Sequence, residues 1–328
     1  MELKTINIAT IGTSCITEQF ISVIKSLNQF SLAAVFSRDM EKAKTFAQKH
    51  HAEKFYDQLE DMASDSAIDA VYIASPNFLH YAQAMMFLKA GKHVLCEKPM
   101  ASNEREAEEM IRTSREKNLV LLEAIRPMYD PGLHIVRENL FKLGKIRRVS
   151  FQYGKYSSKY DAFLEGKEPN IFSPACSAGA LMDMGVYCVN PLIYLFGFPH
   201  KIQADCVKLR NGIDGAGTVL MNYGDMTADI SYSKISDSRL HSEIQGEEGT
   251  MLVSSIAIPR KAVICYRNGD EEKLSIPDCE NNMIFEAEVF ARAIAGQIDI
   301  TEYQEKTLES MRLMDQIRKQ EGIVFPAD

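Results

Sequence analysis

Residues 94–99 read Val-Leu-Cys-Glu-Lys-Pro, and this stretch decides how the rest of the chain is interpreted. Its apolar start predicts the end of a buried strand, which the proline closes. Lys98 therefore follows the carboxyl end of a strand, where open α/β sheets bind their ligands. Pro99 fixes its own φ and restricts the residue before it, so the backbone that carries Lys98 is stiff. We interpret Lys98 as a restrained cation at a ligand site, although a single lysine after a strand is more often a solvated surface charge.

The first 124 residues alternate between strand and helix patterns. We expect strands at 5–11, 32–36, 70–74, 93–97 and 120–123. The helices between them pass through 20–27, 40–49, 78–89 and 102–117. Short apolar strands that alternate with amphipathic helices indicate a parallel sheet with helices on both faces.

Charge and composition argue against several classes of protein. The 328 residues are enough for two domains, and the net charge of −8 disfavours a nucleic-acid or anionic-membrane partner. No apolar run approaches the ~18 residues of a membrane span, and the N-terminus has no basic-then-apolar leader. The seven cysteines form no C-x-x-C pair and the seven histidines show no ligand spacing, so we expect no disulfide framework and no metal. The sequence predicts a reduced, cytoplasmic protein.

The first turn from strand to helix, residues 12–17, reads GTSCIT. A dinucleotide fingerprint has the form G-x-G-x-x-G/A, and here only Gly12 matches, with Ser14 and Thr17 in place of the other glycines. Hydroxyl groups and the helix N-terminus can still hold phosphate, although a plain turn is an equal alternative. The residues that we assign to cofactor binding in this turn are Gly12, Thr13, Ser14, Cys15 and Ile16.

The end of the second strand carries the signal for the type of cofactor. An NAD site usually has an acidic residue at this point, whereas an arginine suits the 2′-phosphate of NADP. Ser37 and Arg38 follow the strand, and Asp39 comes two residues late and is expected to cap the next helix. These residues favour NADP over NAD, the alternative for Arg38 being a solvated surface charge.

Ser75, Pro76 and Asn77 follow the next strand, and His80 lies one turn into the helix after it. This strand end borders the nicotinamide half of a cofactor in such a fold. We therefore assign all four residues to cofactor binding. A buried structural histidine is an equal alternative for His80.

Residues 71–99 (VYIASPNFLHYAQAMMFLKAGKHVLCEKP) closely resemble the Gfo/Idh/MocA oxidoreductase family. The family signature T-P-N-x-x-H…A-G-K-H-V-x-x-E-K-P is matched almost residue by residue, with Ser75 in place of the threonine. The resemblance implies a Rossmann domain that binds NAD(P), which we place at residues 1–124, and adds Glu97 and Lys98 to its cofactor contacts. It also implies a C-terminal α+β domain, residues 125–328, whose open sheet carries the substrate site and the oligomer contacts.

The second half of the chain shows strands in a run. We expect them near 146–154, 201–209, 216–223, 226–233, 239–246, 250–254 and 261–266, followed by helices at 283–295 and 301–320. This order indicates a large, mostly antiparallel sheet. The family frame E-A-x-x-x-R-F-x-P recurs at 123–131, but Met128 replaces its arginine, so the role of Arg126 is open.

A second motif, SAGALMDMGVYCVN at 177–190, resembles the family pattern G-G-x-L-x-D-x-G-x-H/Y-x-x-D. On an α-helix Asp183 and Tyr187 are four residues apart and share one face. Gly185 costs about 1 kcal/mol inside a helix, which is tolerable if the nicotinamide approaches the backbone there. The alternative is a core helix with a buried tyrosine. The tyrosine resembles most closely the dimeric dihydrodiol dehydrogenase branch of the family, while Asn190 replaces a common aspartate.

The resemblance implies hydride transfer, for which we assign Tyr187 as the general acid/base. A free tyrosine has a pKa of about 10, and the ammonium of Lys98 would favour its phenolate. Asp183 would orient Lys98 or a substrate hydroxyl. An alternative gives the proton transfer to Lys98 itself. The substrate candidates, each of which is alternatively an exposed polar residue, are Arg126, Lys155 and Tyr160.

The leading hypothesis is an NAD(P)-dependent oxidoreductase, with NADP preferred, that acts on a hydroxyl or carbonyl of a sugar, polyol or diol. Two alternatives remain, a redox-neutral NAD-dependent glycosidase and a non-catalytic dinucleotide-binding regulator. We expect a small-molecule substrate, no nucleic acid, no membrane and, from the resemblance, a homodimer or homotetramer. The sequence leaves the substrate, the physiological direction and the oligomeric state open.

Overall fold

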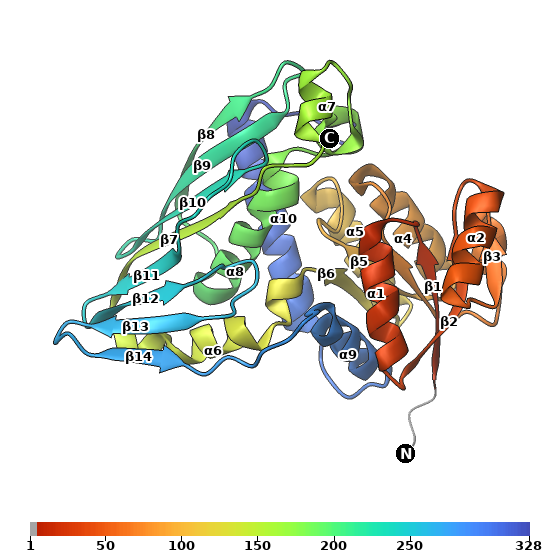
Figure 1. The fold of residues 1–328 in the computed structure, drawn as a ribbon, viewed down its shortest axis with the longest axis horizontal. Coiled ribbons are helices and arrows are strands. Elements are labelled where there is room, and N and C mark those ends of the chain that lie inside the picture. The colour runs from red at the N-terminus through yellow and green to blue at the C-terminus, as the bar shows by residue number, and fades with distance from the viewer. Residues whose placement is uncertain (1–4) are drawn as a thin grey trace. The chain divides into compact units, whose positions relative to one another are not determined.

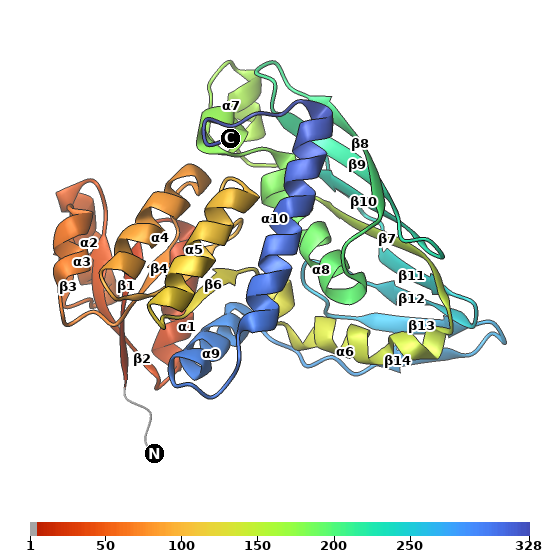
Figure 2. The same ribbon diagram turned by 180° about the vertical axis from the view of Figure 1, so that it is seen from behind.

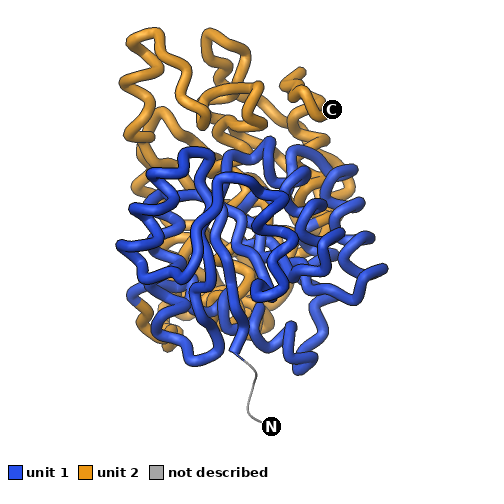
Figure 3. Tube along the Cα trace, turned by 90° about the vertical axis from the view of Figure 1, so that its right-hand side faces the viewer, with its two compact units in different colours: residues 1–124, 280–307 blue, residues 125–279, 308–328 orange. Residues whose placement is uncertain are grey.

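The computed structural model describes residues 5–328, and its backbone forms two compact units (Figure 3). The first unit contains the chain up to Ala124 together with Glu280–Thr307, and the second contains Ile125–Cys279 together with Leu308–Asp328. The chain thus passes into the second unit between residues 124 and 125. Residues 280–307, which the sequence analysis placed in the C-terminal domain, belong to the first unit.

The first unit is built on a six-stranded sheet in which every pairing is parallel (Figure 1). Its order is β3-β2-β1-β4-β5-β6. The strands are β1 (Ile6–Ile11), β2 (Phe30–Phe36), β3 (Lys54–Tyr56), β4 (Ala70–Ile73), β5 (His93–Glu97) and β6 (Leu121–Ala124). The predicted doubly wound parallel sheet is confirmed. The short strand β3 was missed, because two of its three residues are exposed and it has no apolar pattern.

Helices cover both faces of this sheet (Figures 1 and 2). They are α1 (Cys15–Ser26), α2 (Met40–His50), α3 (Leu59–Ser64), α4 (His80–Lys89), α5 (Glu104–Glu116) and α9 (Met283–Ile294). Strand β4 has no exposed side chain, as expected for a parallel sheet between two helix layers. The strand order reverses between β1 and β4, so the crevice at their carboxyl ends is the expected ligand site.

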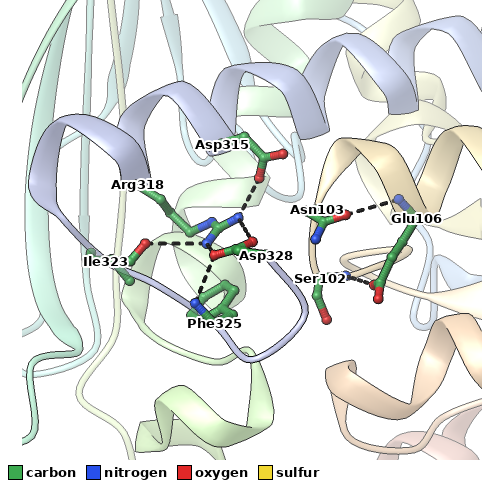
Figure 4. Close-up of polar contacts among 8 residues, drawn as sticks. All are labelled: Ser102, Asn103, Glu106, Asp315, Arg318, Ile323, Phe325 and Asp328. Carbon is green, nitrogen blue, oxygen red and sulfur yellow. Dashed lines mark hydrogen bonds and ion pairs between the residues drawn. The ribbon is translucent and has the colours of Figure 1, made fainter.

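Helix α5 begins with a capping box (Figure 4). The box directly follows residues 98–101, the segment that carries Lys98. The Asn103 side chain accepts a hydrogen bond from the N–H of Glu106 at 3.0 Å, and the Glu106 carboxylate accepts one from the N–H of Ser102, also at 3.0 Å. Such reciprocal bonds satisfy backbone donors that a helix start leaves unpaired. The cap therefore fixes where the segment that carries Lys98 ends.

The second unit is built on an eight-stranded sheet in the order β14-β13-β12-β11-β7-β10-β9-β8. Its strands are β7 (Ile146–Gly154), β8 (Lys201–Lys208), β9 (Asp214–Asn222), β10 (Thr227–Ser233), β11 (Ser242–Gly246), β12 (Gly249–Val253), β13 (Ala262–Tyr266) and β14 (Glu271–Leu274). Only the β7–β10 pair is parallel among the described pairings. The predicted, mostly antiparallel open sheet is confirmed.

One face of this sheet forms the core of the second unit. Val149, Phe151 and Ile230 alternate along β7 and β10 and have no exposed surface. Helix α8 (Val186–Phe196) packs against these two strands. The other α-helices of the unit are α6 (Pro131–Asn139), α7 (Tyr160–Leu164) and the last part of α10 (Thr301–Glu321).

Among the described residues, one stretch, Pro174–Phe196, is long and apolar enough to cross a membrane by length and composition. However, 72% of its apolar window is buried inside the protein, and the core helix of a soluble protein passes the same test.

The C-terminal end is fastened to α10 by Arg318, whose guanidinium binds Asp315 at 2.6 Å and Asp328 at 2.7 Å (Figure 4). Arg318 is 3% exposed, so these carboxylates balance a buried cation. The carboxylate of Asp328 also accepts a hydrogen bond from the N–H of Phe325.

Candidate functional site

A cavity of about 320 Å³ lies in the first unit at the carboxyl ends of β1, β2 and β4. This is the crevice that the strand order predicts. Seven of the predicted cofactor residues line it: Gly12, Thr13, Ser14, Ser37, Arg38, Ser75 and Pro76. The sequence analysis missed the other five lining residues: Ile11, Phe36, Ala74, Leu79 and Gln83. Three of these, Ile11, Phe36 and Ala74, lie at strand ends directly before predicted residues, so the strand ends could have revealed them.

Gly12 shapes the floor of this cavity. Its φ is +112°, and a Cβ at this position would lie 2.7 Å from the carbonyl oxygen of Ala74. The backbones that follow β1 and β4 therefore approach more closely than any other residue type allows. This cradle fits the tight turn from strand to helix that the first fingerprint glycine permits, which sets the start of α1 beside the cavity.

The N-terminus of α1 opens beside the same turn. Ser14 is the N-cap residue, but its side chain does not cap the helix and its Oγ lies 3.4 Å from Thr17 Oγ1. Cys15 and Ile16 are the first two residues of the helix and do not line the cavity, and their backbone N–H groups are among those that a helix start leaves without an intrahelical acceptor. Helix N-termini of this kind bind phosphate through such groups.

His80 is fully buried and does not line the cavity. Its Nδ1 lies 2.9 Å from the carbonyl oxygen of Pro99, and its Nε2 lies 2.8 Å from that of Ser75. Burial lowers the pKa of His80, which favours the neutral ring. A neutral imidazole donates to one of these two carbonyls and packs against the other, so His80 lies between the segment after β4 and the segment that carries Lys98.

Glu97 holds the backbone of Lys98 in place through hydrogen bonds of its side chain. Its carboxylate accepts a hydrogen bond from the hydroxyl of Tyr72 at 2.5 Å, and the Tyr72 ring stacks on Phe20 with centroids 3.8 Å apart. The other carboxylate oxygen of Glu97 accepts a hydrogen bond from the N–H of Lys98 at 3.2 Å. The Lys98 side chain is half-buried, and the Lys98–Pro99 peptide bond is cis. Neither Glu97, Lys98 nor Asn77 lines the cavity.

Glu123, at the end of β6, is a support that the sequence analysis did not assign. It accepts hydrogen bonds from the N–H of Met100 at 2.8 Å and from the Thr307 hydroxyl at 3.0 Å. Burial raises its pKa to about 7. The sequence feature that could have identified Glu123 is the family frame at residues 123–131, which begins with this glutamate.

The second motif lies in the second unit, and its helix is not the regular α-helix that we expected. Residues Leu181–Gly185 form a π-helical turn that continues into α8. A π turn inserts one residue into the helical repeat, so the regular α-helical spacing that we assumed for Asp183 and Tyr187 does not apply through this segment. Asp183 retains 30% exposure, and the half-buried Tyr187 ring contacts Tyr153 edge-on at 5.4 Å.

Asp214 at the start of β9 fixes the beginning of this π turn. Its buried carboxylate accepts a hydrogen bond from the N–H of Leu181 at 2.6 Å. Gly179 makes room for it, because a Cβ there would lie 2.2 Å from Asp214 Oδ1. Burial raises the pKa of Asp214 to about 6. Asp214 is 33 residues from Leu181, so no local pattern could have revealed it.

Asp183 forms an ion pair with Lys234, with its Oδ2 2.9 Å from the lysine Nζ. We had not predicted this contact, since Asp183 was expected to orient Lys98 or a substrate hydroxyl. Lys234 follows β10 and has no exposed surface.

The three substrate candidates lie in different local surroundings. Arg126 is half-buried and starts a 3₁₀ turn, Arg126–Met128. Lys155 is exposed after β7. Tyr160 begins α7 and packs against Phe172, with centroids 5.5 Å apart. A second cavity, of about 660 Å³, lies in the second unit between strands β8–β10 and residues 236–240, and none of these candidates lines it.

Two family models match the chain. Residues 6–124 match "GFO_IDH_MocA: Oxidoreductase family, NAD-binding Rossmann fold", and residues 141–252 match "GFO/IDH/MocA C-terminal domain". The chain belongs to the GFO/IDH/MocA family. The family prediction is therefore confirmed, and the protein is an oxidoreductase that uses a nicotinamide dinucleotide.

Relatives of this GFO/IDH/MocA protein match over nearly its whole length. It is 44% identical to scyllo-inositol 2-dehydrogenase (NADP(+)) IolU of Bacillus subtilis (strain 168), over 98% of this chain and 99% of that one. It is 29% identical to trans-1,2-dihydrobenzene-1,2-diol dehydrogenase of Homo sapiens, over 97% of each. The structure of KijD10, a 3-ketoreductase from Actinomadura kijaniata with NADP and TDP-benzene, shares the fold with a TM-score of 0.87 at 22% identity, over 97% of this chain and 98% of that one.

Proposed function

We propose that this protein is an NADP(H)-dependent dehydrogenase of cyclitols and related polyols or diols. The observation that carries the cofactor preference is the lining of the first-unit cavity. Ser37 and Arg38 lie where an NAD site usually has a carboxylate, and no acidic side chain lines the cavity among the described residues. The substrate class is supported by the 44% identity to an NADP(+)-dependent scyllo-inositol 2-dehydrogenase.

In this proposal the segments after β1, β2 and β4 hold the dinucleotide. Gly12 allows the tight turn into α1, the first N–H groups of α1 bind a phosphate, and Arg38 pairs with the 2′-phosphate. Bound NADP supplies the hydride acceptor for oxidation, and the hydride chemistry is its own. The protein contributes position and electric field.

Three side chains carry the remaining chemistry. Tyr187 takes the proton from the substrate hydroxyl, and the positive charge of Lys98 favours the phenolate that does so. Asp183 accepts a hydrogen bond from a second hydroxyl of the substrate. Proton transfer by Lys98 itself is the alternative, and the Tyr187→Phe variant separates the two.

We further propose that the protein is a cytoplasmic homo-oligomer. The face of the second-unit sheet opposite its core exposes Val207 at 55% and Leu220 at 52%, which favours contact with a second copy. The net charge of −8 and the seven free thiols support a reduced compartment without nucleic-acid partners.

The experiment that tests the proposed function is a titration with NADPH and NADH, followed by an assay with NADP⁺ and cyclitols. A charged hydrogen bond contributes about 1.5–3 kcal/mol, and because Arg38 is exposed we expect the lower value, so Arg38→Ala weakens NADPH binding about tenfold. NADH affinity stays unchanged, as does NADPH binding by the control Arg112→Ala, an exposed arginine on α5. Equal affinity of the wild-type protein for both cofactors, or no oxidation of any polyol or diol, would refute the proposal.

A further inference from the structure

Lys234 is a fully buried lysine in the segment that follows β10. Lysine is rarely buried completely, because its ammonium loses its hydration unless charges and hydrogen bonds compensate. Three contacts of the Nζ atom contribute to this compensation. It lies 2.9 Å from Asp183 Oδ2, 3.0 Å from the carbonyl oxygen of Ile171 and 4.9 Å from the centre of the Phe172 ring.

These contacts join two parts of the second unit that are far apart in sequence. Asp183 belongs to the π turn, and Ile171 and Phe172 belong to the loop after α7. The backbone of Lys234 is itself held, since its N–H donates to Gly215 and its carbonyl accepts from Ser157. The ammonium is therefore fixed at the point where the loop, the sheet and the π turn meet.

The loop on the other side of this ammonium is anchored independently. Arg210 donates to the carbonyl of Lys167 at 2.8 Å, and Asn211 donates to the carbonyl of Phe172 at 2.7 Å. Arg210 also donates to the carbonyl of Phe163, so the segment 163–172 is fastened at both ends. Arg210 and Asn211 already hold this loop without Lys234. The contact between Lys234 and Asp183 therefore requires its own explanation.

The ion pair is asymmetric in exposure. Lys234 has no exposed side-chain surface, whereas Asp183 retains 30%. The carboxylate is therefore fixed from the buried side and remains accessible from the other. Because an uncompensated buried ammonium is costly, the pair favours an ionised Asp183, and an ionised carboxylate only accepts hydrogen bonds.

We propose that Lys234 is a positioning residue that keeps Asp183 ionised and oriented as the acceptor for a substrate hydroxyl beside the reacting carbon. The inference rests on the proposed function and deepens it. It assigns the selectivity for substrates with a neighbouring hydroxyl to a lysine that does not touch the substrate. A carboxylate aimed in this way binds a diol or cyclitol and disfavours the corresponding deoxy compound.

The charges around Lys234 make this role measurable. Two carboxylates face it, Asp183 from the π turn and Asp214 from β9, while Lys155 and Tyr156 on the adjacent loop are exposed. Removing the ammonium leaves Asp183 easier to protonate. A new acid limb in the pH profile of kcat/KM therefore distinguishes positioning from simple packing.

The test compares Lys234→Met, Lys234→Arg and the control Lys201→Met, an exposed lysine of β8, in kcat, KM and pH profile. We expect Lys234→Met to lower kcat/KM for a cyclitol about 10²-fold and to add an acid limb, because a misplaced binding group costs about that factor. Lys234→Arg keeps the charge and recovers most of the loss. NADPH affinity stays unchanged in all three variants.

A second measurement uses the wild-type enzyme and needs no variant to fold. A cyclitol and its analogue without the adjacent hydroxyl should differ about 10²-fold or more in kcat/KM. Absence of that discrimination overturns the inference. So does a folded Lys234→Met variant with wild-type kinetics and pH profile. No turnover of any polyol by the wild-type enzyme overturns the proposed function and this inference with it.

Discussion

Replacement of Gly179 by alanine tests how the π turn that carries Asp183 is built. Gly179 has a φ of +114°, and a Cβ there would lie 2.2 Å from Asp214 Oδ1 and 3.0 Å from Ile213 Cγ1. The alanine therefore fits only if the Asp214 carboxylate moves. That carboxylate is buried and accepts the N–H of Leu181 at 2.6 Å, so its movement releases the start of the π turn.

The expected loss of stability has two parts. A non-glycine residue in left-handed backbone costs roughly 1–2 kcal/mol. Displacing a charged hydrogen-bond acceptor from a buried donor adds roughly 1.5–3 kcal/mol. We therefore expect Gly179→Ala to lower the free energy of unfolding by about 2.5–5 kcal/mol.

Gly166 provides a matched control in the same unit. Its φ is +93°, but nothing lies within 4 Å of the position that a Cβ would take. Gly166→Ala therefore incurs only the backbone cost of about 1–2 kcal/mol. Urea unfolding followed by circular dichroism measures both variants, and kcat for polyol oxidation should fall only in Gly179→Ala. Equal destabilisation of the two variants would refute the role we assign to Asp214.

Two further predictions concern the first unit. The pKa of Glu123 is about 7 in the folded protein and 4.5 in the unfolded reference, so the folded state binds the proton more tightly. The free energy of unfolding therefore falls by up to about 3 kcal/mol as the pH rises from about 4.5 through 7. Urea unfolding at both ends of this range should show the fall in wild type and not in Glu123→Gln; parallel curves would contradict the assignment. Gly12→Ala, with its Cβ 2.7 Å from the Ala74 carbonyl oxygen, should abolish NADPH binding in a fluorescence titration. Gly91 also has a positive φ but has open space around it, so the control Gly91→Ala should bind NADPH normally. Equal NADPH binding by both variants would refute the role that we assign to Gly12.

The sequence predicted the first unit well because its strands are buried on both faces. A strand such as β4 is then a continuous apolar run that stands out from its neighbours. The same logic located the cavity, since Gly12, Ser37 and Ser75 each follow such a run. It failed for β3, whose residues are mostly exposed.

The support of the site was far less predictable. Asp214 and Lys234 are buried charges whose partners lie distant in sequence, and nothing in their local patterns distinguishes them from surface residues. The π turn at Leu181–Gly185 depends on the same long-range contacts, so a helical pattern alone predicted a regular α-helix. The family pattern predicted a glycine at position 179. It did not predict that the glycine is required by the nearby carboxylate of Asp214.

The most direct test of the account is rapid mixing of the NADP⁺-loaded enzyme with a cyclitol, followed by the absorbance of reduced nicotinamide. The account predicts a fast reduction that slows when the carbinol carbon carries deuterium and that is lost in Lys98→Ala and Tyr187→Phe, while both variants still bind NADPH. Reduction at the wild-type rate in both variants would contradict the assigned roles of Lys98 and Tyr187. No reduction by a wild-type enzyme that binds NADPH would mean that the protein is not a polyol dehydrogenase.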